Sequence, residues 1–559
     1  MTFSSNFDNG NLSRVERAGN SSSNFRIWTA LDNQGTEYQS KHGAWFHFCV
    51  TGLPMGCVLR IQIVNASPHG GLYKHDMRPV YRSNTTNQRW TRTKASVRFT
   101  KEGDSAHVVF EHSVDSKDDK LYFAFTYPYS YSQVQAELAA LDKEYKHAND
   151  TDHINAMVKD SNKDDIYYTR ELLTKSRDER RVDLLTISSY EGISTTEREP
   201  LFESLFPEHV ARVVQNNTTH APEQYSTMPT SLSRPAHFRT KEIIFISARV
   251  HPGEVPAQHT FKGILNLLLD KTDLRARELR KRYVFKLIPI LNPDGVFRGH
   301  FRMDQLGQNL NRYYKRPDPV LQSPIFAAKS CMDYYAKIEK LAVYLDFHAH
   351  TSRRGCFIYG NVLDSAEDQI QNQLFCRLIA LNTPHFDYEG CLFSKEHMNR
   401  IDNCDAAKGL TAEGSGRVST YLDYGLIHSY TIECNYNTSK SGNEVPPLDN
   451  DPMGQHPEIP AQPLTSNPEK YTPASYAGVG RGCILAILDL RGNNPCSRIP
   501  KSKIKTFERI RNCVMMEVRG RKEYMGKHVH RLHKRSEERK PGGRELHLPE
   551  QVVWRYLVL

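Results

Sequence analysis

Two apolar runs of this 559-residue sequence each end in residues that could bind a metal ion. The run Ile243–Val250 is followed by His251 and, after a Pro-Gly pair, by Glu254, whereas the run Leu341–Phe347 is followed by His348. The Pro-Gly pair permits a sharp turn, because Pro fixes one backbone dihedral and Gly frees the next. Two imidazoles and one carboxylate leave a fourth tetrahedral position open for water, as catalytic zinc requires.

Neither part of this pattern is decisive alone. A His-x-x-Glu spacing also occurs in ordinary surface turns. His350 competes with His348 because both follow the same apolar run, although the position directly after the run favours His348. If both runs are strands of one open α/β sheet, their carboxyl ends meet at the edge where such sheets bind ligands. The pattern therefore predicts one zinc ion per chain at that edge.

The segments around these residues alternate between strand and helix signals. Short apolar runs typical of buried strands are separated by helical patterns such as Pro256–Leu269, which has Pro in its first turn. This alternation predicts an α/β domain over residues 131–495 with a mixed, largely parallel sheet. Residues 25–130 instead show short apolar and aromatic runs between turn residues, which favours a smaller antiparallel β-sandwich.

The two ends of the chain are predicted to lie outside these domains. Residues 1–24 are rich in Ser and Asn, which favours a disordered N-terminus. Residues 496–559 form a basic tail without a clear core. From Pro495 to the end there are 17 Lys and Arg against 7 Asp and Glu, so this segment carries the whole net charge of +10. Such a tail would steer acidic partners, and it contains no nucleic-acid recognition motif.

Composition excludes several classes of protein. With 38% hydrophobic and 25% charged residues, the chain resembles an ordinary soluble protein. The first twenty residues lack the apolar core of a secretory signal, and the most apolar run, Ile484–Leu490, is far shorter than the roughly 20 residues of a membrane span. The eleven cysteines include no Cys-x-x-Cys pair, which favours a reducing compartment over a disulfide scaffold.

Four motifs in this order resemble those of the zinc carboxypeptidases of the carboxypeptidase A class. They are His251–Glu254, Asn292–Gly295, Asn309–Arg312 and Ser429–Glu433. The flanking residues, namely Arg249–Glu254, Arg298–Arg302 and His428–Asn437, are more narrowly similar to the cytosolic carboxypeptidases, above all to the type-five branch that trims glutamate from tubulin. The resemblance runs from about Phe25 to Pro495 and includes the β-rich amino-terminal domain of the cytosolic branch.

The resemblance implies roles for four further residues. Glu433 matches the general base, which takes a proton from the attacking water and passes it to the leaving amine. Arg302 is at the position that stabilises the oxyanion, although Arg298 and Arg312 are nearby candidates. Asn311 and Arg312 match the pair that binds the terminal carboxylate, which suits a two-pronged guanidinium. The alternative for this pair is a helix-cap Asn beside a surface Arg.

Specificity is expected to come from the segment before Glu433. Arg417 lies near the position where the family sets side-chain preference, and a cation there would attract glutamate; the alternative is a solvated surface residue. Tyr421 is a candidate mobile phenol over the site. The sequence departs from the digestive relatives at Asn309, where they have an acid that orients a zinc histidine, so the support of that histidine must be built differently.

The resemblance therefore implies a zinc metallocarboxypeptidase that removes C-terminal or branch-point glutamates from polyglutamylated proteins, with tubulin or other acidic glutamate-rich tails as partners. A cytoplasmic location is expected, with microtubule association or a nuclear location as further options, and neither a membrane nor nucleic acid as a partner. Two alternatives remain. One is a metal-dependent deacylase or amidase on the same fold. The other is a non-catalytic microtubule-binding protein, against which the retention of all metal ligands and the base argues.

Overall fold

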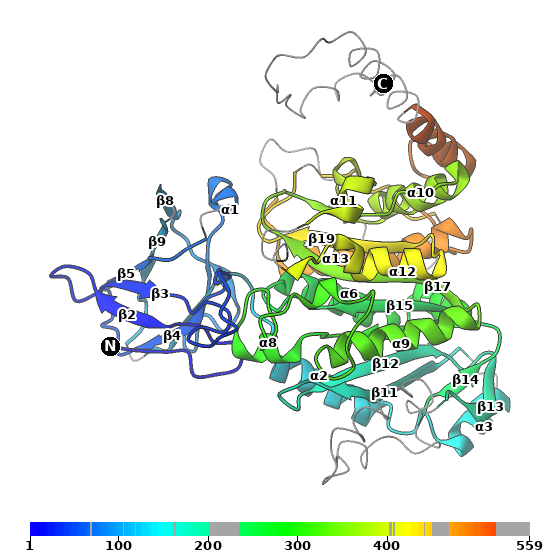
Figure 1. The fold of residues 1–559 in the computed structure, drawn as a ribbon, viewed down its shortest axis with the longest axis horizontal. Helices are drawn as coiled ribbons and strands as arrows, with labels where there is room; N and C mark the ends of the chain where they lie inside the picture. Colours follow the sequence, from blue (N-terminus) through cyan, green and yellow to red (C-terminus); the bar gives the residue numbers. More distant parts are fainter. Residues whose placement is uncertain are drawn as a thin grey trace.

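The computed structural model describes residues 1–520 except 68–69, 104, 118, 160–163, 201–233, 402–404, 406–407, 441 and 450–468. Two bodies lie side by side: an amino-terminal β-sandwich, drawn in blue, and a larger α/β domain (Figure 1). The predicted fold classes of both parts are confirmed. None of the helices in the described ranges is long and apolar enough to cross a membrane.

The sandwich consists of two five-stranded sheets. In sheet order, the first contains β1 (Thr2–Ser4), β4 (His47–Thr51), β10 (Leu121–Ala124), β6 (Val80–Ser83) and β7 (Thr91–Arg92). The second contains β2 (Arg14–Arg17), β3 (Asn24–Trp28), β5 (Val58–Ile63), β9 (Ser105–Ser113) and β8 (Arg98–Glu102). Neighbouring strands are antiparallel except β3 and β5, which run parallel. One short helix, α1 (Gly71–Lys74), follows β5.

The prediction of a disordered stretch over residues 1–24 is wrong. Strands β1 and β2 both lie within it. The Phe3 ring packs against Phe25 at 4.8 Å between ring centroids. Asn9 and Asn11 are buried, at 1% and 6% exposure. Polar composition wrongly predicted disorder here, because these asparagine side chains form buried hydrogen bonds to backbone groups instead of facing water.

The α/β domain is built on a seven-stranded sheet with four parallel strands at its centre. In sheet order these are β11 (Ile166–Lys175), β12 (Arg181–Ser189), β16 (Tyr283–Ile288), β15 (Glu242–Ala248), β17 (Leu341–His350), β19 (Ser429–Asn435) and β18 (Cys356–Tyr359). The pairs from β16 to β19 are parallel, whereas β11, β12 and β18 run antiparallel to their neighbours. The central strands are buried on both faces, which is why they read as continuous apolar runs.

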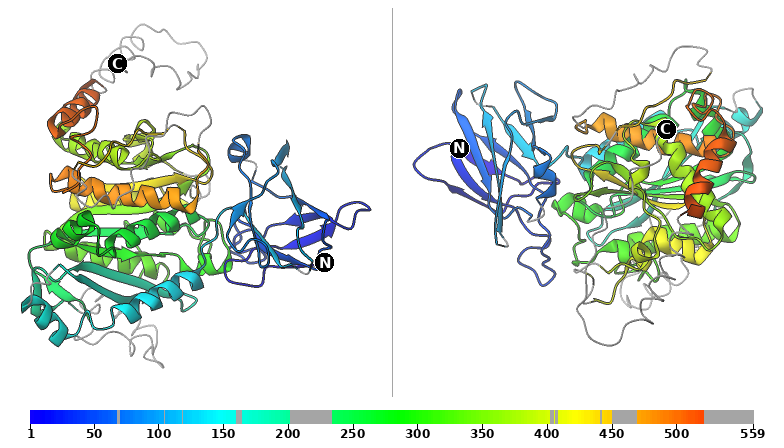
Figure 2. Two further views of the ribbon diagram at one scale, coloured as in Figure 1. Left: turned by 180° about the vertical axis from the view of Figure 1, so that it is seen from behind. Right: turned by 90° about the horizontal axis from the view of Figure 1, so that it is seen from above.

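Helices cover both faces of this sheet (Figures 1 and 2). One face carries α2 (Tyr131–Glu144), α6 (Val255–Leu268), α7 (Leu274–Arg282), α10 (Ala366–Asn382) and α13 (Pro473–Leu490). The other carries α3 (Thr151–Lys159), α9 (Ser323–Lys337) and α12 (Gly416–Tyr424). Shorter elements complete the domain: β13 (Ile193–Arg198), β14 (Ala236–Phe238), α8 (Pro293–Arg298), η1 (Leu310–Arg312), η2 (Tyr388–Gly390), α11 (Lys395–Asn399) and η4 (Ala412–Gly414).

The first part of the predicted tail belongs to the domain. Residues 507–520 are helical, and Ile510, Val514 and Val518 on that helix are buried. Tyr388 donates its hydroxyl hydrogen to a Glu517 carboxylate oxygen at 2.7 Å. Their spacing of four residues places these apolar side chains on one helix face, a pattern that the high charge of the segment concealed. The prediction of a tail without a core is therefore wrong up to residue 520, and residues 521–559 lie outside the described ranges.

Candidate active site

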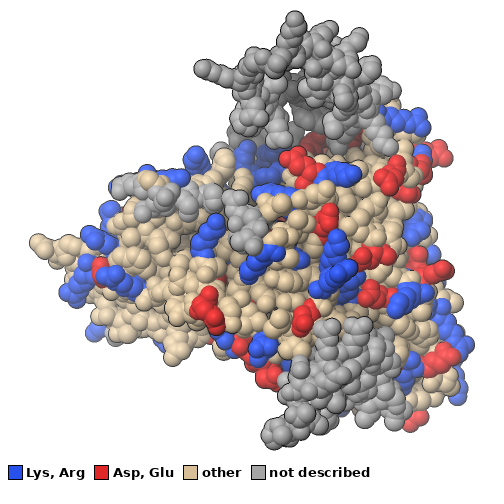
Figure 3. All heavy atoms as spheres, viewed as in Figure 1, with Lys and Arg blue, Asp and Glu red and all other residues tan. Residues whose placement is uncertain are grey.

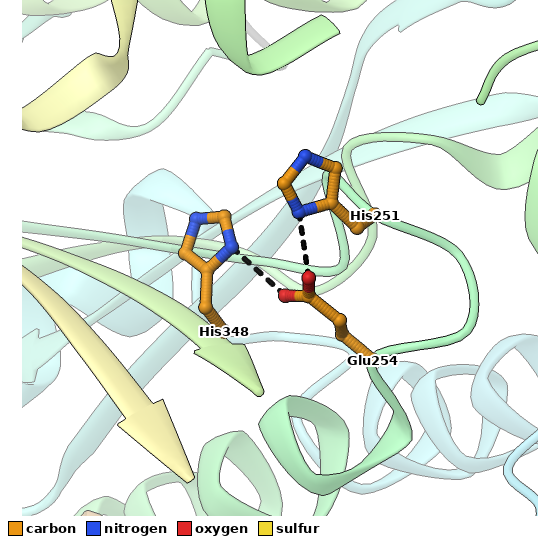
Figure 4. A group of neighbouring side chains, drawn as sticks. All are labelled: His251, Glu254 and His348. Carbon is orange, nitrogen blue, oxygen red and sulfur yellow. Dashed lines mark hydrogen bonds and ion pairs between the residues drawn. The ribbon is translucent and has the colours of Figure 1, made fainter. Parts of the chain in front are cut away.

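The three predicted metal ligands converge at the carboxyl edge of the central strands. His348 lies near the end of β17, while His251 and Glu254 lie on the turn between β15 and α6 (Figure 4). The Glu254 carboxylate lies between the two rings, 2.8 Å from His251 Nδ1 and 2.9 Å from His348 Nδ1. All three side chains are buried, and their ligand atoms lie within 4.8 Å of one another.

The outer nitrogens of both rings face acceptors. His251 Nε2 is 2.9 Å from Asn309 Oδ1, and His348 Nε2 is 2.7 Å from Asp346 Oδ2. Acceptors at Nε2 keep the proton there and leave each Nδ1 lone pair directed at the shared centre, which is the tautomer that a metal ligand needs. Two neutral imidazoles and a carboxylate are the donors that zinc prefers. The donor set therefore fits a single zinc ion.

His350 is occupied elsewhere. Its Nδ1 accepts the backbone hydrogens of Ser352 and Arg353, both at 3.1 Å, and its Nε2 lies 3.2 Å from the Tyr359 hydroxyl. Neither ring nitrogen is left for the metal centre. Of the two candidates, the structure brings His348 to the cluster.

The turn that carries His251 and Glu254 is held by residues on both sides. Arg249 is fully buried with φ of 58°, and its guanidinium donates to the Pro252 carbonyl from Nε at 3.0 Å and Nη2 at 2.6 Å. Glycine is required at Gly253, because a Cβ there would lie 2.5 Å from Cδ2 of Phe301. The turn is thus fixed by packing, and it gives both ligands a defined direction.

Asn309 is supported by a carboxylate from a distant segment. The Asn309 amide donates to Asp405 Oδ2 at 3.0 Å, and the same oxygen lies 3.2 Å from Nε of Arg312. Asp405 is buried at 2% exposure. In the digestive relatives an acid contacts the zinc histidine directly. Here the acid, Asp405, contacts Asn309, and Asn309 in turn contacts His251. Asp405 therefore links the metal centre to the predicted carboxylate-binding arginine.

Glu433 faces the same centre from the neighbouring strand. It is the direct partner of His348 in the parallel pairing of β17 with β19. Its Oε2 atom is buried and has no hydrogen-bond partner among the described residues. Burial and, second, the negative charge of Glu254 raise the pKa of Glu433 to about 8, and a bound cation would act in the opposite direction. The position suits a group that takes up and releases a proton.

The predicted oxyanion residue and the predicted carboxylate-binding pair lie near the metal ligands. The Arg302 guanidinium is 3.9 Å from Glu254 at its nearest nitrogen. Asn311 is buried; its Oδ1 accepts the Gly416 amide hydrogen at 3.0 Å, and its Nδ2 lies 3.3 Å from His348 Nε2. Arg312 donates to the Asn311 carbonyl at 2.7 Å. These contacts bring the predicted oxyanion and carboxylate-binding groups to the side of the metal ligands.

Arg417 is buried, and the alternative of a solvated surface residue is wrong. It lies in the first turn of α12 at 4% exposure, and its Nη1 donates to the Gly360 carbonyl at 2.7 Å and to Asn361 Oδ1 at 2.5 Å. Its Nε has no hydrogen-bond partner among the described residues. Burial lowers the pKa of the guanidinium to about 10, and the charge of Glu433 partly offsets that effect.

The structure does not bring Tyr421 to the site. This residue lies one turn further along α12 than Arg417, where it is partly exposed. Burial and the nearby carboxylates of Asp364 and Asp368 raise its pKa, which places the phenol near the start of α10. A different phenol lies close to the base. Burial and the charge of Glu433 raise the pKa of Tyr359 to about 12.

Sequence reasoning missed Asp346, Tyr359 and Asp405. Asp346 could have been found, because residues two apart on a strand point to the same side and Asp346 precedes His348 by two. Tyr359 lies on β18, a short edge strand without a clear signal. Asp405 is 96 residues from Asn309 in the sequence, and nothing local marks it as a partner.

Family models match both bodies. Residues 154–435 match the zinc carboxypeptidase family, and residues 3–126 match the cytosolic carboxypeptidase N-terminal domain. A solved metallo-carboxypeptidase from Burkholderia cenocepacia shares the fold, with a TM-score of 0.58 at 19% identity over 88% of this chain and 98% of that one. The family match and the donor set thus define a zinc carboxypeptidase.

Curated relatives narrow this class. The chain is 34% identical to the cytosolic carboxypeptidase-like protein 5 of Danio rerio, over 92% of this chain and 67% of the relative. It is also 34% identical to the protein of the same name from Homo sapiens, over 93% and 67% of the two chains. The chain belongs to the cytosolic carboxypeptidase family of zinc carboxypeptidases. The recognition made from the motifs is confirmed.

Proposed function

We propose that this carboxypeptidase removes glutamate from the ends or branch points of polyglutamylated proteins, tubulin foremost. The observation that carries the proposal is the state of Arg417, a buried cation near the general base. Among the described residues, no carboxylate lies within ion-pair distance of its guanidinium, and its Nε is unsatisfied. A substrate carboxylate would supply the missing partner.

The energetic argument rests on the cost of an unpaired buried charge. Neutral oxygen atoms of Gly360 and Asn361 are the partners of Arg417, and they offset the lost hydration only in part. An apolar lining would be cheaper if the pocket received apolar side chains. A glutamate side chain that enters beside Glu433 would pair with Arg417 in a site shielded from water, where such a pair is strong. Terminal lysine or arginine would be repelled.

The residues of the chain divide the reaction between them. Arg312 and Asn311 bind the α-carboxylate and so place the last peptide bond next to the metal ligands. Zinc, held by His251, Glu254 and His348, would act as a Lewis acid and promote ionisation of water. Glu433 Oε2 accepts the proton of the attacking water and returns it to the leaving nitrogen.

Arg302 completes this division of roles. Its guanidinium lies on the Glu254 side of the cluster, 3.9 Å from that carboxylate at its nearest nitrogen. From there it can stabilise the charge that develops on the substrate carbonyl oxygen.

The proposed partners are acidic glutamate-rich protein tails, and the proposed location is the cytoplasm, at microtubules. On the face drawn in Figure 3, Lys and Arg side chains are spread over both domains, with acidic side chains among them on the α/β domain. No broad field of one sign covers that face. The net charge of +10 that residues 495–559 carry would supply long-range attraction to an acidic partner, over distances near the Debye length.

The test compares two arginine variants on two peptides that differ only in their last residue, glutamate or leucine. Arg417→Met keeps an unbranched stem and removes the guanidinium with its charge. It should lower kcat/KM for terminal glutamate by a factor that corresponds to a loss of about 2–4 kcal/mol in transition-state stabilisation. The slow cleavage of the leucine peptide should remain almost unchanged. Arg312→Met should depress both substrates alike, because every terminus offers the same α-carboxylate. An equal loss on both peptides in Arg417→Met would refute the assignment of glutamate preference to Arg417.

A further inference from the structure

The amino-terminal sandwich contributes a buried carboxylate to the loop that carries Arg302. Asp32 is 1% exposed, and its two carboxylate oxygens accept three consecutive backbone hydrogens of the catalytic domain. Oδ1 accepts that of Phe301 at 2.6 Å, whereas Oδ2 accepts those of Arg302 at 2.8 Å and Met303 at 2.9 Å. Three successive amides that point at one anion fix the conformation of the segment that donates them.

Asparagines of the sandwich hold the same loop at further points. Asn33, next to Asp32 and in the left-handed region with φ of 58°, donates from its amide to the Asp304 carbonyl at 2.8 Å. Asn11 donates to the Gly299 carbonyl at 2.9 Å. The loop over residues 299–304 is thus bound at its start, middle and end by side chains of the other domain.

The segment that carries Asp32 is closed by its own backbone hydrogen bonds. The Asp32 backbone N–H donates to the His42 carbonyl at 2.7 Å, and its carbonyl accepts from the Ser40 amide at 2.9 Å. The two loops also approach closely, since a Cβ at Gly307 would lie 2.6 Å from the Tyr38 carbonyl oxygen. Asp32 therefore sits on a closed loop of the sandwich that fits directly against the catalytic domain.

The opposite side of the loop touches the metal-binding turn. The Gly253 N–H donates to the Phe301 carbonyl at 2.8 Å, and the Phe301 backbone fills the space that a side chain at Gly253 would need. One peptide further, Arg302 reaches to within 3.9 Å of Glu254. The residues that Asp32 binds are thus the ones that contact the metal-binding turn and carry the predicted oxyanion group.

We propose that Asp32 is a positioning residue of the active site, through which the β-sandwich holds Arg302 and its loop against the metal-binding turn. The sandwich is then part of the catalytic apparatus and not only a neighbouring domain. Asp32 touches neither substrate nor metal and acts through the three amides that it binds. The inference rests on the peptidase chemistry proposed above but not on the identity of the terminal residue.

The decisive variant is Asp32→Asn, which keeps size and shape but replaces one acceptor oxygen with an NH₂ group. Whichever oxygen is replaced, at least one of the three amides then faces a donor. Asp119→Asn is the matched control, because Asp119 is also a buried aspartate of the sandwich, at 3% exposure, and accepts the Asn84 amide hydrogen at 3.1 Å.

Three measurements on the full zinc-loaded chain apply to both variants: hydrogen exchange of the amides of residues 301–303, zinc content, and kcat and KM on the glutamate and leucine peptides. Asp32→Asn should speed exchange at 301–303 and lower kcat about 10- to 100-fold on both peptides, with KM and zinc content nearly unchanged. The Asp119→Asn variant should change none of these quantities. Unaltered exchange at 301–303 in Asp32→Asn would overturn the proposal whatever the substrate is.

A double-variant cycle with Arg302→Ala separates positioning from general damage. If Asp32 acts through Arg302, the Asp32→Asn change should cost little further kcat once Arg302 is gone. Full additivity of the two losses would overturn the role through Arg302. The Asp32 proposal predicts an equal loss of kcat on both peptides, whereas the glutamate proposal predicts a loss on the glutamate peptide only. The failure of one proposal can therefore be distinguished from the failure of the other.

Discussion

Replacement of Asp405 by asparagine should weaken zinc binding, although Asp405 is not a ligand. Its Oδ2 accepts from the Asn309 amide at 3.0 Å and so holds the Asn309 carbonyl oxygen toward His251 Nε2. With an amide at position 405, Asn309 loses the charge that fixes its orientation. If Asn309 turns over, its NH₂ group faces Nε2, and the ring proton moves to Nδ1, where it blocks the metal.

The size of the effect follows from this arrangement. Loss of an outer partner of a metal-bound histidine typically costs 10- to 100-fold in metal affinity, which corresponds to roughly 1.4–2.7 kcal/mol. Arg312 simultaneously loses the carboxylate that lies 3.2 Å away. The Arg312 and Asp405 side chains are 9% and 3% exposed. The free energy of unfolding of the variant should therefore also fall by about 3–5 kcal/mol, the range for a broken buried ion pair.

The assay is the zinc dissociation constant, measured by competition with a chromogenic chelator at one fixed pH. Asp489→Asn is the control for burial, since Asp489 is 2% exposed and accepts from Asn382, Asn494 and Ser497 away from the site. It should lose stability but keep its zinc affinity. The reasoning fails if Asp405→Asn binds zinc as tightly as the parent protein, or if Asp489→Asn weakens binding equally.

Three further outcomes are expected. Glu433→Gln should retain one zinc per chain yet lose at least about 100-fold in kcat, and near-normal turnover would assign proton transfer to another group. Deletion of residues 521–559, which removes the last part of the basic segment but spares the buried Ile510 and Val514, should slow action on tubulin at low salt but not on short peptides; a rate on tubulin that ignores both salt and deletion would contradict this. Burial lowers the pKa of His259 and His428 to about 4, below the value near 6.5 in the unfolded chain. The unfolded state therefore binds more protons between these values, so stability should fall as pH drops from 6.5 to 4, by about 2 kcal/mol per histidine at pH 5. Urea unfolding of zinc-free protein at pH 7 and pH 5 measures this, and His259→Gln should show the smaller difference.

The sequence was most informative where chemistry and secondary structure coincide. The ends of β15, β17 and β19 are marked by apolar runs that stop at polar residues, so the positions of His251, His348 and Glu433 at one sheet edge could be predicted. Parallel strands that are buried on both faces need continuous apolar runs, and such runs are easy to recognise in a sequence.

The supporting contacts could not be predicted in the same way. Asp405 and Asp32 act on residues 96 and about 270 positions away, and a buried aspartate in a loop has the same local sequence as a solvated one. The order of residues 1–24 was missed for a related reason: Asn9 and Asn11 are polar in composition, but their hydrogen bonds are made inside the molecule.

The hydrogen bonds between the two domains also determine the order in which parts of the chain can fold during synthesis. Asn9 and Asn11 are synthesised long before the residues whose carbonyls they bind, which are Val296 and Gly299. At roughly 5–20 residues per second, those partners are synthesised on the order of 15 to 60 s later. Until then the Asn9 and Asn11 amides, on the sandwich surface that will face the catalytic domain, donate their hydrogens to water. The loop of residues 299–304 is therefore made after the surface that holds it, and its carbonyls replace the water bound to the Asn11 amide there when the catalytic domain folds.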